Sequence, residues 1–152
     1  ALPEARPFYE PDADNHIGNY LSEGDPVLVQ VLRDPEEDKG AKLTMRISLS
    51  GRDLVFLPGG KGFSISRRIC DNDDRRRLNA LMEVVSGSGE GGFIVRTAAV
   101  DAEEKDLSAE VARLRRGWSE IMLLREKANA PVCLFQDVEL AWRALREHGG
   151  PI

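Results

Sequence analysis

The sequence has few of the residues that usually carry chemistry, with only two cysteines and two histidines in 152 residues. Cys70 and Cys133 stand far apart, without a CxxC spacing or a nearby pair of histidines, so neither predicts a zinc site. We expect both to be reduced core residues of a cytosolic protein, in preference to a disulfide or a metal site. His16 and His148 have no Ser, Cys or carboxylate partner at the spacing of a known catalytic or metal motif, and both are interpreted as surface residues.

Long hydrophobic runs are also missing. No apolar run approaches the roughly 18 residues that cross a bilayer, which argues against a membrane-spanning helix. Residues 1–15 are acidic and proline-containing and lack an apolar segment, so we expect no signal peptide. The first residue is Ala rather than Met, as expected for an excised piece or a processed start.

The net charge of −5 conceals a segregation of charge along the chain. Residues 39–77 contain ten basic and four acidic side chains and carry +6, whereas the rest of the chain carries −11. A basic stretch on an acidic chain indicates local attraction of phosphates. An ordinary solvated sheet face explains the same pattern, and charge alone does not decide between the two.

The first half of the chain predicts short strands joined by tight turns. Residues 1–24 contain prolines and acids without a sustained period, so we expect them to be extended or loosely ordered. Dense β-branched runs and alternating apolar residues predict four strands, at 27–32, 43–49, 54–57 and 64–69.

The second half predicts helices. Asp71 is a candidate N-cap for a helix that ends at Gly87, and Asp101 with Glu104 resembles a capping box that opens a longer helix. The apolar stripe of the longer helix consists of Leu107, Val111, Leu114, Trp118, Ile121 and Met122. Further elements are a strand at 93–95, a last strand at 132–135 and a final helix capped by Asp137. The predicted fold class is α+β, with strands followed by a β-α-β-α section.

Several motif-like strings do not stand in the context that their chemistry needs. Residues 87–92 satisfy GxGxxG, but they follow a helix and precede a strand, the reverse of a dinucleotide site, and are interpreted as a flexible turn. The acids at 71–74 are candidate ligands for Mg²⁺. Their place directly before a helix favours instead a role in capping the N-terminus of that helix and compensating its dipole. No nucleophile, base and oxyanion hole assemble, so we expect no catalytic residues in this chain.

Arg96 and Thr97 follow the apolar strand at 93–95. A guanidinium offers several donors to a phosphate, and the adjacent hydroxyl and backbone N–H add more. A terminal monophosphate carries more charge than a diester, so a compact donor cluster can prefer it. The dipeptide alone says little, because a surface salt bridge is its default interpretation.

The combination of segments is more specific than any one of them. The strings KGAKLT (39–44), ISLSGRDLVFLP (47–58), ISRRI (65–69), FIVRTA (93–98) and LFQD (134–137) occur in an order that resembles the bacterial ribonuclease E/G family. The resemblance covers roughly residues 24–147. It implies a partial RNA-binding barrel of OB type at 25–50, made of short antiparallel strands, and a 5′-sensor-like subdomain at 51–148. The acidic, proline-containing N-terminal segment at 1–24 matches the family poorly.

The family resemblance also implies roles for particular residues. It implies that Arg96 and Thr97 contact the 5′-monophosphate of single-stranded RNA, and that Gly51 and Val55 approach the terminal nucleotide. The expected contacts to the RNA backbone are Lys39, Arg67 and Arg68. Asp53 stands where the family usually has an aromatic residue.

The same resemblance implies that the parent protein is a cytoplasmic, oligomeric, hydrolytic endoribonuclease of RNA processing and decay. Its magnesium-binding aspartates and its zinc-linking CPxC motif are expected outside this chain, which would hold no cofactor of its own. One alternative is a protein-interaction or assembly module that has lost 5′-end sensing. The other is a self-contained enzyme of another class, which the missing catalytic constellation disfavours.

Overall fold

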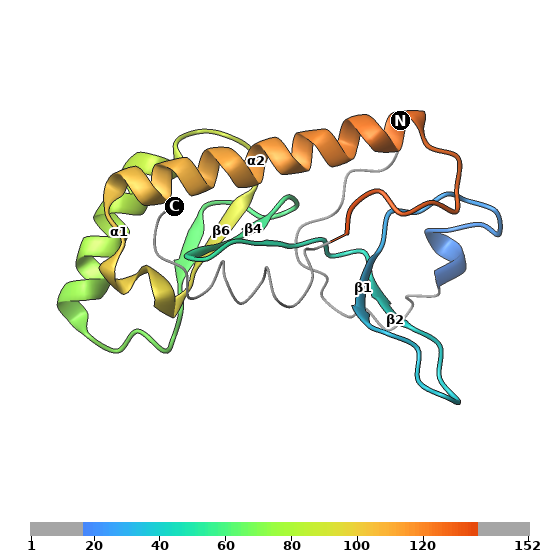
Figure 1. The fold of residues 1–152 in the computed structure, drawn as a ribbon, viewed down its shortest axis with the longest axis horizontal. Helices are drawn as coiled ribbons and strands as arrows, with labels where there is room; N and C mark the ends of the chain where they lie inside the picture. The colour runs from blue at the N-terminus through green and yellow to red at the C-terminus, as the bar shows by residue number, and fades with distance from the viewer. Residues whose placement is uncertain (1–16, 137–152) are drawn as a thin grey trace. The chain divides into compact units, whose positions relative to one another are not determined.

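The computed structural model describes residues 17–136, and the chain divides into two compact units, residues 1–47 and residues 48–152. His16, His148 and the predicted final helix from Asp137 lie outside the described residues. The fold is α+β, as predicted, with two α-helices and short strands in two sheets among the described residues (Figure 1). No helix in this range is long and apolar enough to cross a membrane.

The first unit contains a short 3-10 helix, η1 (Ile17–Asn19), and the antiparallel strands β1 (Gln30–Arg33) and β2 (Lys42–Thr44). The pairing is irregular between Val31 and Arg33, and the connection carries a bridge between Glu36 and Lys39. The two strands form a sheet of their own, so the described part of this unit is a partial barrel without closure.

The second unit contains a four-stranded sheet in the order β3-β4-β6-β5. Its strands are β3 (Leu49–Ser50), β4 (Leu54–Leu57), β5 (Phe63–Ile65) and β6 (Gly92–Val95). Its helices are α1 (Asn72–Ser86), the 3-10 helix η2 (Thr97–Asp101) and α2 (Glu104–Lys127). Neighbouring strands are antiparallel except β5 and β6, which are parallel because α1 crosses over between them. The predicted β-α-β-α section is therefore β5-α1-β6-α2.

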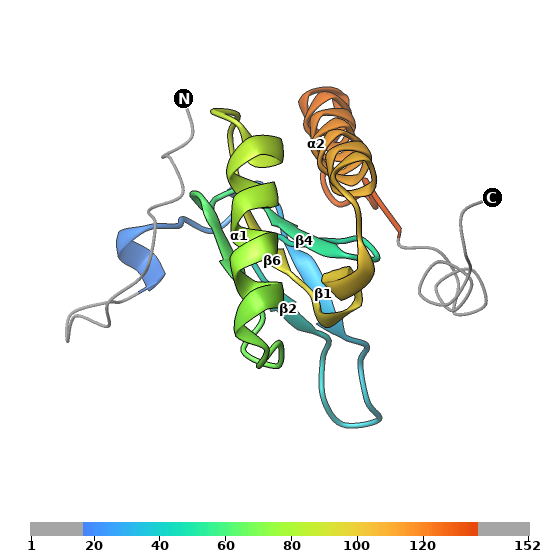
Figure 2. The same cartoon turned by 90° about the vertical axis from the view of Figure 1, so that its left-hand side faces the viewer.

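One face of this sheet carries the core. Alternate residues of β4 and β6 are buried, and the rings of Phe56 and Phe93 lie 5.1 Å apart between their centroids. The helices α1 and α2 contact one another and cover this face (Figure 2). Their buried residues are Leu78 and Met82 of α1, and Leu107, Glu110, Val111, Leu114 and Ile121 of α2.

Helix α1 begins and ends where the sequence predicts. The carboxylate of Asp71 accepts hydrogen bonds from the backbone N–H groups of Asp73 (2.8 Å) and Asp74 (3.0 Å). These two bonds lower the pKa of Asp71, because they favour its charged form. Gly87 ends the helix with a φ of 53°, a conformation that side chains with a Cβ rarely adopt. The capping role predicted for the acids at 71–74 is thus confirmed for Asp71.

Three predicted strands are too long. The strand predicted at 27–32 begins only at Gln30, because its partner β2 ends at Thr44, opposite Gln30. The strand predicted at 43–49 is interrupted, because the N–H of Arg46 bonds to Oγ1 of Thr44 (3.1 Å) and that of Ile47 to the carbonyl of Met45 (3.1 Å). These local bonds replace the bonds of a ladder. The strand predicted at 64–69 ends at Ile65, where the chain turns.

Three further predictions are wrong. Residues 132–135 form no strand. The capping box of α2 pairs Glu103 with Asp106, two residues beyond the predicted pair, because η2 occupies Thr97–Asp101. Cys70 and Cys133 are free but exposed, not core residues, because each lies in a loop.

Candidate functional site

Three segments of the second unit meet at one edge of its sheet. The strands β5 and β6 are parallel and in register, with Ile65 opposite Val95, so the residues that follow them emerge side by side. The N–H of Ser66 donates to the carbonyl of Val95 (2.9 Å), and the N–H of Arg96 donates to the carbonyl of Asp53 (2.8 Å). The turn between β3 and β4, the turn after β5 and the start of η2 therefore adjoin one another.

Arg96 is tied to the turn at 51–53 by its side chain as well as by its backbone. Nη1 of Arg96 donates a hydrogen bond of 2.6 Å to the carbonyl of Gly51. Thr97 follows as the first residue of η2 and is exposed. The sheet thus brings together Gly51, Arg96 and Thr97, three of the four residues predicted to recognise an RNA 5′ end.

The fourth residue, Val55, lies one position inside the same edge. It is half-buried in β4, with Ser50 and Ile94 opposite it on the neighbouring strands. Its side chain points to the sheet face opposite Leu54 and Phe56, because successive side chains of a strand alternate between faces. Val55 therefore offers an apolar surface next to the edge that holds Arg96.

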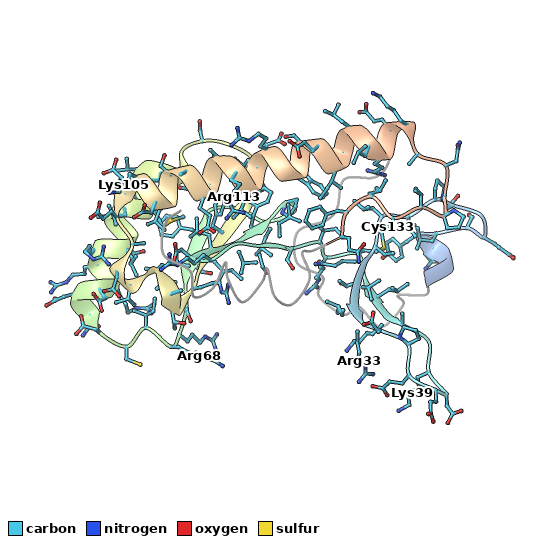
Figure 3. The ribbon with its side chains drawn as sticks, in the orientation of Figure 1. Arg33, Lys39, Arg68, Lys105, Arg113 and Cys133 are labelled. Atoms are coloured by element: carbon cyan, nitrogen blue, oxygen red, sulfur yellow. The ribbon has the colours of Figure 1, made fainter. Side chains whose placement is uncertain are left out.

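The carboxylate of Glu110, from α2, supports this turn from the other side. One oxygen accepts from the N–H of Arg52 (2.6 Å) and the second from the N–H of Asp53 (2.9 Å). Nη2 of Arg113 donates to the first oxygen at 2.7 Å (Figure 3 labels Arg113). Glu110 is 6% exposed, so a buried charge is matched here by three donors.

Asp53 adds a second buried acid to this edge. Its carboxylate lies 3.9 Å from Nε of Arg52. Burial, and then the neighbouring charge of Glu110, raises the pKa of Asp53, and the opposing pull of Arg52 and Arg96 is weaker. The site therefore combines cationic donors with a carboxyl group whose charged form is disfavoured.

The basic stretch at 39–77 divides into structural and exposed cations. Nη1 of Arg75 donates to the carbonyls of Ser66 and Ile69, at 3.0 Å each, and Arg77 donates to the carbonyls of Val100 and Ala102. These two side chains connect α1 to the segments around it. They are therefore not part of an ordinary solvated sheet face, which was the second interpretation of the basic stretch.

Arg67 and Arg68 behave differently from the arginines of α1. Both are exposed in the turn after β5, and within residues 17–136 their side chains contact no acid or carbonyl at bonding distance. Arg68 is labelled in Figure 3. Because Ser66 is bonded to Val95, these two cations lie at the same edge as Arg96.

Lys39 belongs to the first unit and stands beside three acids. It lines a shallow hollow of about 290 Å³ together with Glu36, Glu37 and Asp38. Its backbone closes the turn, through N–H to carbonyl bonds of 2.9 Å in both directions with Glu36. Its predicted contact with the RNA backbone stays a prediction.

A second cavity, of about 260 Å³, lies at the opposite end of the sheet, beyond the last residue of β4. It is lined by Phe56, Pro58, Glu90, Arg115, Trp118 and Ser119. Arg115 is held there by bonds to the carbonyls of Ser86 (2.7 Å) and Glu90 (3.3 Å). This cavity is therefore separate from the edge that carries Arg96.

Glu110 is the site residue that sequence reasoning missed. It falls at i+3 from Leu107 and i−4 from Leu114, within the apolar stripe of α2. A charged residue at such a position is buried against the core, where it needs partners. A charged residue within an otherwise apolar helical stripe is therefore the sequence signal by which Glu110 could have been found.

Metal ligands do not gather in the described part of the chain. Between residues 17 and 136, no three His, Cys, Asp or Glu side chains come close enough together to hold an ion.

Known proteins are similar to this chain in sequence. Residues 48–150 match the model of the ribonuclease E/G family. The chain is 36% identical, over 86% of its length, to ribonuclease G of Salmonella typhimurium and to ribonuclease E of Synechocystis, and 31% identical over 88% to a ribonuclease E/G-like protein of Pyropia yezoensis. It spans 27%, 19% and 26% of those three relatives. With a family model matched over residues 48–150, which contain the whole four-stranded sheet and both helices, the chain belongs to the ribonuclease E/G family.

Proposed function

We propose that this chain binds single-stranded RNA and recognises its 5′-monophosphate at the sheet edge formed by the turn at 51–53, Arg96 and Thr97. The single observation that carries the proposal is the hydrogen bond from Arg96 to Gly51. It fixes the guanidinium of the residue that precedes the exposed Thr97, and arginine is the side chain best suited to bind a phosphate through paired N–H groups.

The surrounding residues take complementary parts. Val55 provides apolar contact for the first nucleotide, and the backbone of Gly51 lets that nucleotide approach closely. Arg67 and Arg68 attract the following phosphates, since exposed cations at the same edge raise the local concentration of a polyanion. Lys39 makes a further backbone contact from the partial barrel.

Within the whole protein, this chain acts as an attachment site. We infer that the parent is a Mg²⁺-dependent endoribonuclease of RNA processing and decay in the bacterial cytoplasm, with its hydrolytic centre and its zinc-linked oligomer contacts outside this chain. Holding the 5′ end raises the effective concentration of a distal segment at that centre. Incubating the chain with RNA and Mg²⁺ is expected to give no cleavage, and specific cutting would contradict this division of roles.

Fluorescence anisotropy tests the recognition itself. Short single-stranded RNAs that differ only at the 5′ end, as monophosphate, hydroxyl or triphosphate, are compared at low salt, where phosphate contacts are strongest. The monophosphate should bind best, and Arg96→Ala should abolish that preference. Arg116→Ala is the matched control, because Arg116 is an exposed arginine of α2 away from the turn. Equal binding of all three RNAs by the unmodified chain would refute 5′-end sensing.

A second function has its own support. The first unit exposes Val31, Leu32, Leu43 and Met45 by more than half of their surface. Val31, Leu32 and Leu43 lie in this small sheet and Met45 follows it. Exposed apolar side chains close together are typical of a contact surface. An assembly module that has lost sensing predicts a discrete oligomer by light scattering and no difference between RNA 5′ ends.

A further inference from the structure

Glu110 is a buried acid that the proposed RNA contacts do not use. It lies on α2, a different element from the segments that carry Arg96 and Gly51, and is 6% exposed. A buried carboxylate is costly unless its oxygens are hydrogen-bonded. Here both oxygens accept backbone N–H groups of one turn, at 2.6 and 2.9 Å, so its main contacts are with the turn at 51–53.

The turn at 51–53 is held from two sides. Arg96 donates to its carbonyls, from Nη1 to Gly51 and from the backbone N–H to Asp53. Glu110 accepts from its N–H groups, those of Arg52 and Asp53. The orientation of the Gly51 carbonyl, and with it the position of the Arg96 guanidinium, therefore depends on both side chains.

We propose that Glu110 is a positioning residue for recognition of the RNA 5′ end: through the turn at 51–53 it fixes the Gly51 carbonyl that holds the Arg96 guanidinium. This inference rests on the proposed function and adds to it a residue that does not touch RNA.

The two N–H groups of the turn at 51–53 require two acceptor atoms from residue 110, and a side chain of the right volume is not enough. Each carboxylate oxygen receives one backbone N–H. Glutamine has the same size, but its amide NH₂ would face one of these N–H donors, and the turn would lose a bond there. Aspartate is shorter by one methylene but keeps both acceptors and the charge. A space-filling role favours glutamine, whereas a positioning role favours aspartate.

The test measures 5′-monophosphate preference, the ratio of the Kd for a 5′-hydroxyl RNA to that for the 5′-monophosphate RNA. We expect Glu110→Gln to lower this ratio by about tenfold, toward one, as the loss of a charge-assisted hydrogen bond implies. Glu110→Asp should retain more of the preference than Glu110→Gln. Glu120→Gln is the control, since Glu120 is an exposed acid on the same helix, and it should leave the ratio unchanged. Far-ultraviolet circular dichroism establishes that each variant is folded.

A measurement on the unmodified chain covers the case in which Glu110→Gln does not fold. Backbone amide exchange by nuclear magnetic resonance should be slow at Arg52 and Asp53 before any RNA is added, because the turn is fixed in advance. Fast exchange of both amides would overturn the inference.

The outcomes separate this inference from the function on which it rests. If the unmodified chain prefers the monophosphate and Glu110→Gln prefers it equally, Glu110 has no positioning role, although the proposed function stands. If the unmodified chain shows no preference, both are overturned. A preference that falls in Glu110→Gln, with exchange slow at Arg52 and Asp53, supports both.

Discussion

Gly51 lies against the carboxylate of Glu110 so closely that a Cβ built on Gly51 would stand 2.6 Å from Cδ and 3.2 Å from Cγ of the glutamate. Contacts under 3.0 Å are not tolerated between such atoms, so one of the two must move. The carboxylate cannot yield easily, because three donors hold it. Glycine is thus required at position 51 by the acid beneath it.

We predict that Gly51→Ala destabilises the chain by roughly 1–3 kcal/mol, the usual cost of forcing an extra methyl into a packed site. In a Glu110→Ala background the same substitution should cost less, since the colliding atoms are gone. Urea denaturation of the four chains gives this coupling as a double-mutant cycle. Gly40→Ala is the control, because a Cβ there meets nothing within 4 Å. Equal costs in the two backgrounds would contradict the contact.

A second prediction concerns the pH dependence of stability. The pKa of Asp53 is raised in the folded chain, so the folded state binds more protons than the unfolded state from about the ordinary value of 3.8 up to the raised pKa. The contribution of Asp53 to stability therefore falls as pH rises through this window and does not return above it. Asp53→Asn should raise Tm at pH 7 relative to the unmodified chain, and the difference should shrink toward pH 4. Asp34→Asn, at an exposed acid, is the control. A difference that does not vary with pH would count against the buried acid as its cause.

The same substitution bears on RNA binding. If the charge of Asp53 weakens attraction of the 5′-phosphate by Arg96, Asp53→Asn should tighten binding of 5′-monophosphate RNA more than binding of 5′-hydroxyl RNA. Anisotropy with the two RNAs measures this, and equal changes for both would show that Asp53 acts on stability alone.

Arg115 is predicted to stabilise the far end of the sheet. Its guanidinium donates to the carbonyls of Ser86 and Glu90 and lies 5.3 Å from the ring centre of Phe93. Arg115→Met keeps much of the apolar stem and removes these donors, at an expected cost of about 1–3 kcal/mol in the free energy of unfolding. Arg116→Met, next to it and exposed, should cost little. Similar losses in the two variants would argue against a specific role for Arg115.

Arg67 and Arg68 should affect RNA affinity without affecting 5′-end preference. Replacing both with alanine should weaken binding of monophosphate and hydroxyl RNAs by the same factor. The slope of log K against log salt should become shallower by about 0.7 for each lost phosphate contact. Arg116→Ala with Lys127→Ala, two exposed cations of α2, is the matched control. A selective loss of monophosphate binding would instead place one of these arginines at the 5′ end.

The elements that the sequence predicted well are those with local signals. Asp71 and Gly87 mark the two ends of α1, because a cap and a left-handed stop act within a few residues. The strand at 54–57 is also as predicted, since its four residues form a continuous apolar run bounded by turn residues. The strand predicted at 43–49 failed because a threonine side chain competes for a backbone N–H, which apolar alternation does not register.

The site was predictable only in part for a similar reason. Arg96 and Thr97 follow a clear strand, so their place at its end could be read from the chain. Glu110 is 57 residues from Asp53, and no local rule links a helix side chain to a distant turn. The parallel pairing of β5 with β6, which brings Arg67 and Arg68 to Arg96, likewise depends on tertiary structure.

The crossover from β5 through α1 to β6 also keeps the glycine-rich segment away from the edge that holds Arg96. Both strands run toward the edge that holds Arg96, so the glycine-rich segment between α1 and β6 enters the sheet at the opposite end. The whole of β6 lies between that segment and Arg96. A change in the length of the glycine-rich segment would therefore disturb the bonds of Arg115 to the carbonyls of Ser86 and Glu90 before it altered the spacing of the residues around Arg96.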